Sequence, residues 1–317
     1  MNKLLKILLA ASFLNSLCWI VLTPVFQYPD EQAHFAQVQD IAELGKVPTS
    51  GNDTSLEILT LERVIGTERN EIGNNSYTYN PKYKTEYNGT NFGNGEKQIA
   101  ALPKESRQEM VKNEATLNPP LYYFLSSVVY KAFSQSDIFT RIIAIRIFSS
   151  LIFLLTIITA YKIGNLVFEK DYLAIALAAS ASFMPMLVHS TSGVLPDSQN
   201  IFLFSVFIFV CLKIIKEGLS QKKLIALIVV ICLGAMTRQN FLITLFILPI
   251  PFIFEFITKK EYRVRFTFIA VGLLALLYVL SYFVPSMDFI RRLDYPESSQ
   301  KIANNPLSNL TLKEHVV

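Results

Sequence analysis

Long apolar stretches alternate with short polar segments along most of this chain, and one polar segment is much longer than the others. A membrane-spanning helix needs about 20 apolar residues. Stretches that approach this length occur at Leu4–Phe26, Ile142–Phe168, Tyr172–Val188, Ile201–Ile215, Leu224–Met236, Phe241–Ile257 and Phe266–Val284. The pattern predicts an all-α integral membrane protein with about seven transmembrane helices and a large polar loop after the first of them.

Basic residues between the apolar stretches predict which ends of the spans face the cytoplasm. They gather at Lys3 and Lys6, at Lys162 and Lys170, at Lys213–Lys223 and at Lys259–Arg265. The positive-inside rule places all of these groups in the cytoplasm, which requires an even number of spans between consecutive groups. The N-terminus is then cytoplasmic, and the long first loop is extracytoplasmic.

Two apolar segments do not fit a single crossing. The stretch Leu224–Ile257 would be about 50 Å long as one helix, which exceeds a hydrocarbon core of about 30 Å. We therefore expect a hairpin with its outer turn at residues 237–240. Pro119–Phe133 is too short to cross, and counting it as a span would place three lysine clusters outside. We expect an interfacial helix there, begun by the two prolines and with its tyrosines in the headgroup zone.

These assignments divide the chain into a first transmembrane helix (1–27), an extracytoplasmic loop with interfacial helices (28–141), a six-helix transmembrane bundle (142–284) and an extracytoplasmic tail (285–317). The first apolar run could instead be a secretory signal. An anchor is favoured, because the run is longer than a usual signal core and has no A-x-A cleavage site. Within the loop, residues 45–112 are expected to be irregular, with short helices near Ser55–Arg63 and Lys104–Asn113.

Composition supports the membrane assignment. Hydrophobic residues make up 51% of the chain and charged residues only 17%, as is typical of integral membrane proteins. The net charge of +4 comes from the clusters between spans, so it indicates topology and gives no reason to expect a nucleic-acid partner. The three cysteines lie inside apolar runs without metal-ligand spacing.

The start of the long loop carries a group of reactive side chains. Asp30, Glu31 and His34 follow directly after the first membrane exit. Residues at this level can act on a lipid-tethered substrate. Each also has a plainer explanation, since Asp30 follows a proline and could cap a helix, and a histidine beside an apolar helix face is commonly an interfacial polar residue.

Further charges return to the same side of the membrane. Asp197 and Arg238 lie in the two later outer turns, and Arg141 and Arg146 lie at the start of the second span. Charges at span edges are costly unless they face a cavity or a partner, so they suggest a site. Carboxylates can deprotonate a hydroxyl, and a guanidinium can bind phosphate oxygens bidentately. Asp197 could also be a helix cap, and Arg238 could reach lipid headgroups.

Five short motifs in a fixed order carry a family resemblance. They are Pro29-Asp30-Glu31-x-x-His34, Asn118-Pro119-Pro120-Leu121-Tyr122-Tyr123, Arg146, Leu195-Pro196-Asp197 and Thr237-Arg238. Together they resemble the GT-C superfamily of multi-span glycosyltransferases that use polyprenyl-phosphate sugars. The branch they resemble includes aminoarabinose transferase, protein O-mannosyltransferases and rhizobial galacturonosyltransferases.

The resemblance implies a role for each matching position. Asp30 would be the catalytic carboxylate, with Glu31 beside it, and Asp197 would be the second outer acidic position. In some members a divalent metal ion is held at this acidic position, which would make Asp30 and Asp197 metal ligands. Arg238 matches a position that contacts the donor phosphate and is more often lysine. Asn118 stands where lysine or histidine is commoner.

The function implied is transfer of a sugar from a polyprenyl-phosphate donor to a hydroxyl of a glycan, lipid or protein acceptor, with inversion, at the outer face of a bacterial inner membrane. His34 and Arg146 would join Arg238 in binding the substrates. A transporter or flippase for lipid-linked saccharides, or a non-catalytic assembly protein of the cell envelope, are the alternatives. Relatives usually continue with further spans, so the chain is expected to be a minimal member, a fragment or an inactive remnant.

Overall fold

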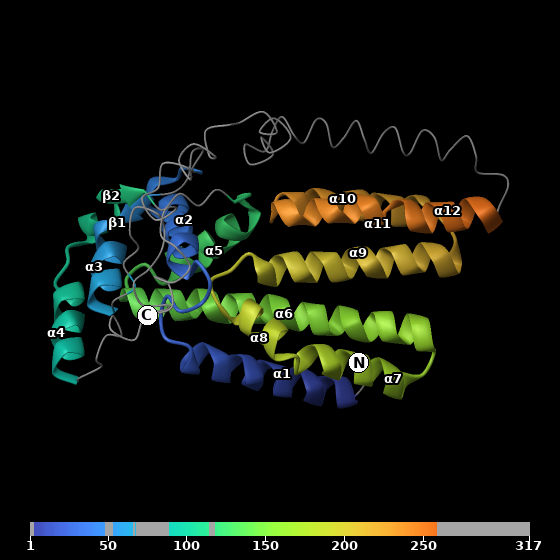
Figure 1. Ribbon diagram of the computed structural model, residues 1–317, viewed down its shortest axis with the longest axis horizontal. Helices are drawn as coiled ribbons and strands as arrows, with labels where there is room; N and C mark the ends of the chain where they lie inside the picture. Colours follow the sequence, from blue (N-terminus) through green and yellow to red (C-terminus); the bar gives the residue numbers. More distant parts are fainter. Residues whose placement is uncertain (1–2, 48–52, 66, 68–88, 114–117, 259–317) are drawn as a thin grey trace, which may run out of the picture.

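A bundle of long helices carries a smaller cap at one end in the computed structural model, which describes residues 3–47, 53–65, 67, 89–113 and 118–258 (Figure 1). The bundle contains α1 (Lys3–Leu22), α6 (Ile138–Phe168), α7 (Asp171–Ser182), α8 (Pro185–Ser192), α9 (Asp197–Glu217), α10 (Gln221–Ala235), α11 (Thr244–Ile247) and α12 (Pro249–Thr258). The cap contains α2 (Glu31–Leu44), β1 (Asp53–Ser55), α3 (Leu56–Ile65), α4 (Gly89–Ala100), β2 (Met110–Asn113) and α5 (Leu121–Ala132).

Three of the described helices, α1, α6 and α9, are long and apolar enough to cross a membrane. The helices α7 and α8 add a fourth crossing if they are counted as one span with a bend of 60°. Pro185 lies in the first turn of α8, where a proline is tolerated because no helical hydrogen bond is lost, and a new helix begins there. The predicted span from Tyr172 to Val188 is therefore broken in two.

The predicted hairpin after α9 is present in a modified form. Helix α10 runs back toward the cap, and the chain turns at Met236–Arg238 into the 3-10 helix η3 (Gln239–Ile243), α11 and α12. A Cβ atom at Gly234 would collide with the ring of Phe241, so the glycine permits the close return of the chain. The span predicted at residues 266–284 and the tail at 285–317 lie outside the described residues, so the total of seven spans stays a prediction.

The cap contains a small sheet that the all-helical expectation missed. Strands β1 and β2 pair antiparallel, with Asp53 opposite Asn113 and a register shift between Thr54 and Ser55. The expected helix near Ser55–Arg63 is present as α3, whereas the segment near Lys104–Asn113 forms the 3-10 helix η2 (Lys104–Arg107) followed by β2. Local turn signals did not reveal this pairing, because its two strands are far apart in the sequence.

Helix α5 joins the cap to the bundle. It occupies most of the predicted interfacial segment, and the N–H group of Leu121 donates to the carbonyl of Met236 at the end of α10 (2.9 Å). Its apolar side chains Phe124 and Val128 are exposed, as an interfacial helix requires. The tyrosines Tyr122 and Tyr123 are fully buried, so the expectation that they lie in the headgroup zone was wrong for these two.

Candidate functional site

Glu31, the first residue of α2, forms a buried ion pair with Arg146 of α6. The Nε and NH2 atoms of Arg146 donate to the two carboxylate oxygens of Glu31 at 2.8 Å and 2.6 Å. The same carboxylate accepts hydrogen bonds from the backbone N–H groups of Phe26 (2.9 Å) and Val194 (3.0 Å). Glu31 is 0% exposed, so its oxygens are directed at the protein rather than at a substrate.

The N–H donors of Arg146 are likewise engaged in hydrogen bonds within the protein. Besides Glu31, its guanidinium donates to the carbonyl groups of Ile20, Thr23 and Pro24, at 3.1, 2.8 and 2.9 Å. The guanidinium carbon also lies 4.7 Å from the centroid of the Tyr28 ring. An arginine has five N–H donors, and these contacts engage them from several sides. We therefore withdraw the expected catalytic role of Glu31 and the substrate role of Arg146, because the pair clamps α1, α2 and α6 together.

The clamp holds a strained segment that ends at Asp30. Phe26 and Asp30 have φ angles of 61° and 55°, in the left-handed region that residues with a side chain rarely adopt. Asp30 is exposed and occupies the position before α2, yet its side chain makes no capping hydrogen bond. The capping alternative is therefore not realised at Asp30. Backbone strain of this kind is often found at functional sites.

Asp197 and Arg238 form a second ion pair at the same end of the bundle. Oδ2 of Asp197, in the first turn of α9, pairs with NH1 of Arg238, which lies just after α10. The two side chains remain 29% and 28% exposed. The sequence predicted that the tips of the two hairpins meet, and this contact brings them together within reach of water.

His34 and Tyr123 form a contact within the cap near this second pair. Nδ1 of His34 lies 2.7 Å from the Tyr123 hydroxyl, and the two rings are stacked with centroids 5.8 Å apart. Burial, followed by the nearby Tyr122 hydroxyl, raises the pKa of Tyr123 well above its ordinary value, while the positive charge of Arg238 opposes this shift. Tyr123 is thus a neutral phenol near the Asp197–Arg238 pair. Tyr123 lies in the motif Asn118–Tyr123, and the sequence alone indicated no role for it.

Two polar side chains near the aspartates have atoms without a hydrogen-bond partner in the described part of the chain. They are Nε2 of Gln32, which is 1% exposed, and Oε1 of Gln199, which is 6% exposed. Gln32 follows Asp30 by two positions, and Gln199 follows Asp197 by two. A buried polar atom without a partner is costly, so a bound polar ligand at this end of the bundle would offer such atoms a partner.

The segment leading to Asp197 packs directly against the segment leading to Asp30. Val194 donates its N–H group to Glu31, and a Cβ atom at Gly193 would lie 2.6 Å from Cγ of Tyr28. The absence of a side chain at Gly193 is therefore what allows this close approach. Asp30 and Asp197 are the next polar positions beyond these contacts, so the fold brings both elements to the same end of the molecule.

The metal expectation receives no support from the described residues. Among them, no group of three His, Cys, Asp or Glu side chains is arranged to hold a metal ion. The Asp197 carboxylate faces a guanidinium instead, and a positive neighbour of that kind competes with a cation for the same oxygens. The assignment of Asp30 and Asp197 as metal ligands therefore stays a prediction.

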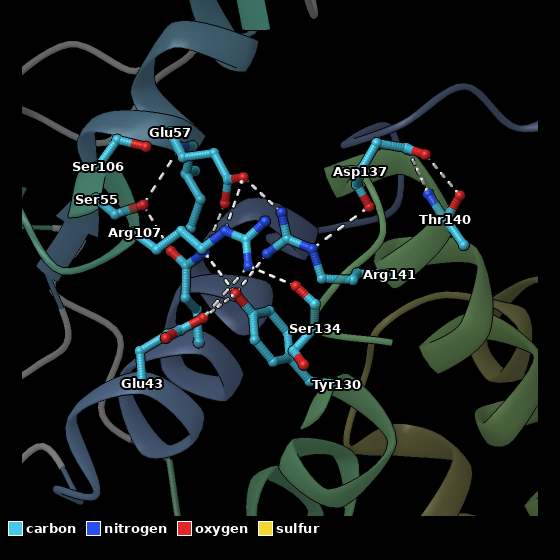
Figure 2. A network of polar contacts seen from close by, with 12 residues as sticks. Glu43, Ser55, Glu57, Ser106, Arg107, Tyr130, Ser134, Asp137, Thr140 and Arg141 are labelled. Carbon is cyan, nitrogen blue, oxygen red and sulfur yellow. Dashed lines mark hydrogen bonds and ion pairs between the residues drawn. The ribbon is translucent and has the colours of Figure 1, made fainter. Parts of the chain in front are cut away.

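The cap holds a third charged cluster, which sequence reasoning did not find. Figure 2 shows Arg107 and Arg141 converging on Glu57 of α3. Tyr130 accepts a hydrogen bond from Arg141 and donates one to Glu43 at 2.9 Å. Arg141 was expected at the outer edge of a span, but its side chain is fully buried and ties α6 to the cap.

Comparisons with known proteins define the family. Neither the curated proteins nor the solved structures gave a match to this chain. The family described as "Predicted membrane protein (DUF2142)" matches residues 13–308. This range includes the cap, both ion pairs at its base and nearly all of the bundle. The chain therefore belongs to the DUF2142 family of predicted membrane proteins.

Proposed function

We propose that this protein is a membrane glycosyltransferase that moves a sugar from a polyprenyl-phosphate donor to an acceptor hydroxyl at the cap end of the bundle. The observation that carries the proposal is the half-exposed Asp197–Arg238 pair, formed between two hairpin tips beside the His34–Tyr123 contact. A guanidinium can bind phosphate oxygens bidentately, and Arg238 places a partly exposed one at the end of α10.

In this proposal Asp30 is the general base. Its carboxylate takes the proton of the acceptor hydroxyl, and the oxygen attacks the anomeric carbon of the sugar. The bond between that carbon and the phosphate oxygen breaks, and the polyprenyl phosphate leaves with the electron pair. A single displacement inverts the anomeric carbon. The exposure of Asp30 at the start of α2 supports this role, because an acceptor hydroxyl can approach from solvent.

Arg238 binds the leaving phosphate, and Asp197 orients Arg238. An arginine has five N–H donors in a planar fork, so pairing one nitrogen with Asp197 leaves others for two phosphate oxygens. Tyr123 is kept neutral by burial, which makes it a hydrogen-bond donor rather than a negative charge that would repel the phosphate.

The test uses two substitutions of one residue. Purified protein is incubated with a radiolabelled polyprenyl-phosphate sugar and an acceptor extract. Asp30→Asn keeps the residue type that tolerates a left-handed backbone, and Asp30→Gly relieves the strain entirely, stabilising the fold by up to about 1 kcal/mol. Both variants are expected to lose transfer while staying folded. Glu169→Gln, which changes an exposed carboxylate at the far end of α6, is the matched control and should retain transfer.

Transfer by Asp30→Asn at the wild-type rate would remove the assigned base. Loss of transfer in Glu169→Gln as well would mean that removing a carboxylate far from the proposed site also abolishes transfer, so the loss in Asp30→Asn would not identify a site.

The proposed location is a bacterial inner membrane, with the cap end outside and the N-terminus in the cytoplasm. Lys170 and Lys216 lie at the end of the bundle opposite the cap, in agreement with the positive-inside rule. Single cysteines at positions 197 and 238, introduced after replacing the three native cysteines, test this. A membrane-impermeant maleimide should label both from outside intact cells. Labelling that requires permeabilised cells would reverse the orientation and overturn the proposed site.

A further inference from the structure

The cap contains a two-lobed hollow that lies apart from the Asp197–Arg238 pair. The larger lobe has a volume of about 600 Å³ and lies between α4, α3 and the link from α5 to α6. The smaller lobe has a volume of about 340 Å³. Both lobes are lined by Lys104, Arg107 and Gln135, so the two lobes adjoin at these side chains. Cavities of 300–1,000 Å³ are the size at which small-molecule sites are found.

The lining combines hydrogen-bonding groups with apolar surface. Gln135 and Ser136 belong to the link between α5 and α6, and Glu96 lies on α4. Ile99 and Phe139 contribute apolar surface to the same lobe. Amides, hydroxyls and carboxylates accept and donate the hydrogen bonds that sugar hydroxyls require. Apolar walls suit the C–H faces of a pyranose ring, which are themselves apolar.

Charge excludes one class of ligand. Among the described residues, the carboxylates on the walls are Glu43, Glu57, Glu96, Glu105 and Asp137, and the cations are Lys104 and Arg107. Arg107 is already occupied, since its Nε atom lies 3.3 Å from Glu57 and its NH1 atom donates to the carbonyl of Ser134 at 2.7 Å. The remaining excess of negative charge repels phosphates and acidic lipid headgroups. The hollow therefore does not suit the phosphate donor of the proposed reaction.

The floor of the hollow is cross-linked by hydrogen bonds and ion pairs. Glu57 accepts hydrogen bonds from Arg107, Arg141 and Gln39, and this network ties α3 to α6 (Figure 2). Rigid walls lower the free-energy cost of ordering a site on binding. We propose that this hollow is a binding site for a neutral or amino-bearing oligosaccharide of two or more residues, one residue in each lobe. The site would hold a glycan at the level where α6 begins, whether or not the protein transfers sugars.

The binding test uses the full-length protein in a detergent without a sugar headgroup, such as lauryl dimethylamine oxide, because a maltoside could fill the site. Chitotriose is the neutral probe and trigalacturonic acid the anionic one, and binding is measured by saturation-transfer NMR and calorimetry. We expect saturable binding of chitotriose and weaker binding of trigalacturonic acid. Absence of saturable chitotriose binding, or tighter binding of the acidic sugar, would overturn the proposal.

Three variants locate the binding. Ala100→Trp fills the larger lobe from an exposed position on α4 and is expected to abolish chitotriose binding. Gln135→Ala should weaken binding about fivefold, the effect of one lost hydrogen bond. Ala132→Trp adds the same bulk at an exposed position of α5 and should bind like the wild type. Equal binding by Ala100→Trp and the wild type would place the sugar elsewhere and refute the site.

The variant Asp30→Asn separates this inference from the proposed reaction. It is expected to bind chitotriose normally even though it has lost transfer, because Asp30 does not line the hollow. Conversely, an inactive wild-type protein that binds chitotriose through Ala100 and Gln135 would retain the glycan site and refute only the transfer reaction. Loss of chitotriose binding in Asp30→Asn would mean that the sugar occupies the other end of the cap, which contradicts the proposal.

Discussion

Two ion pairs between a carboxylate and an arginine lie at the cap end of the bundle, and they differ in solvent exposure and in hydrogen bonding. The Glu31–Arg146 side chains are 0% and 1% exposed, whereas those of Asp197 and Arg238 are 29% and 28% exposed. Glu31 and Arg146 also bond to backbone groups of Phe26, Val194, Ile20, Thr23 and Pro24. The first pair is closed to solvent and saturated, and the second is open to it.

This difference separates a clamp from a candidate site. Both pairs consist of a carboxylate and an arginine at the edges of apolar helices, so the sequence placed all four residues in one site. Burial and hydrogen-bond saturation distinguish them, because a saturated group has no donor or acceptor left for a substrate. The comparison predicts that changes to the first pair act mainly on stability and that changes to the second act mainly on activity.

The largest expected loss of stability comes from breaking the Glu31–Arg146 clamp. Glu31→Ala leaves the Arg146 guanidinium buried without its carboxylate, and breaking a buried pair in this way costs about 3–5 kcal/mol. Thermal unfolding in detergent, followed by helical circular dichroism, should show a clear fall in the midpoint. The double variant Glu31→Ala/Arg146→Ala should lose less than the sum of the two single changes. A Glu31→Ala protein as stable as the wild type would mean that the clamp contributes little.

A second large effect is expected in the cap. Glu57→Ala removes the carboxylate that Arg141 and Arg107 share, and the buried Arg141 then lacks its charged partner, at a cost of about 3 kcal/mol. Hydrogen exchange should increase in α3 and in the start of α6, while α1 and α9 keep their protection. An equal increase throughout the bundle would show that this network holds the whole fold rather than the cap alone.

The sequence predicted the parts of this molecule that depend on local periodicity. The apolar run Leu4–Phe26 appears as α1, and Pro119–Phe133 appears as α5, each shortened by a few residues. The hydropathy pattern did not predict the break at Pro185, because a broken span has the same hydropathy as a straight one. It also missed the pairing of β1 with β2, which joins segments that are distant in the chain.

For the candidate site, the sequence indicated most of the residues but not the hydrogen bonds and burial that distinguish them. Asp197 and Arg238 meet as expected, because α9 begins and α10 ends at the same end of the bundle. Glu31 and Arg146 were misassigned, since no pattern in the sequence reports that one carboxylate accepts from both a guanidinium and backbone N–H groups. Tyr123 was missed for a similar reason. Its importance comes from burial beside His34, which only the tertiary structure reveals.

A smaller loss of stability is expected at Gly193, in the segment that contacts Tyr28 beside the first pair and leads to Asp197 of the second. Gly193→Ala places a Cβ atom 2.6 Å from Cγ of Tyr28, whose ring covers the Arg146 guanidinium. Overpacking of this kind costs about 1–3 kcal/mol. The variant should lower both the unfolding midpoint and the transfer rate, because the same segment leads to Asp197. Gly45→Ala is a contrasting control, since a Cβ atom there meets no neighbour within 4 Å and the only cost is its left-handed backbone.

The smallest effect on stability, and the sharpest separation of the two pairs, is expected from exchanging the charges of the exposed pair. Partly exposed ion pairs contribute about 0–1 kcal/mol, so Arg238→Gln should change the unfolding midpoint little while abolishing transfer. In the exchange variant Asp197→Arg/Arg238→Asp the two charges can still attract each other, so stability returns to the wild-type value. Transfer should stay lost, because the guanidinium now lies on α9 and no longer at the end of α10, where the phosphate is proposed to bind. Recovery of transfer together with stability would show that the pair serves only to join the hairpins. The open pair would then be a second clamp, and the distinction drawn from burial would fail.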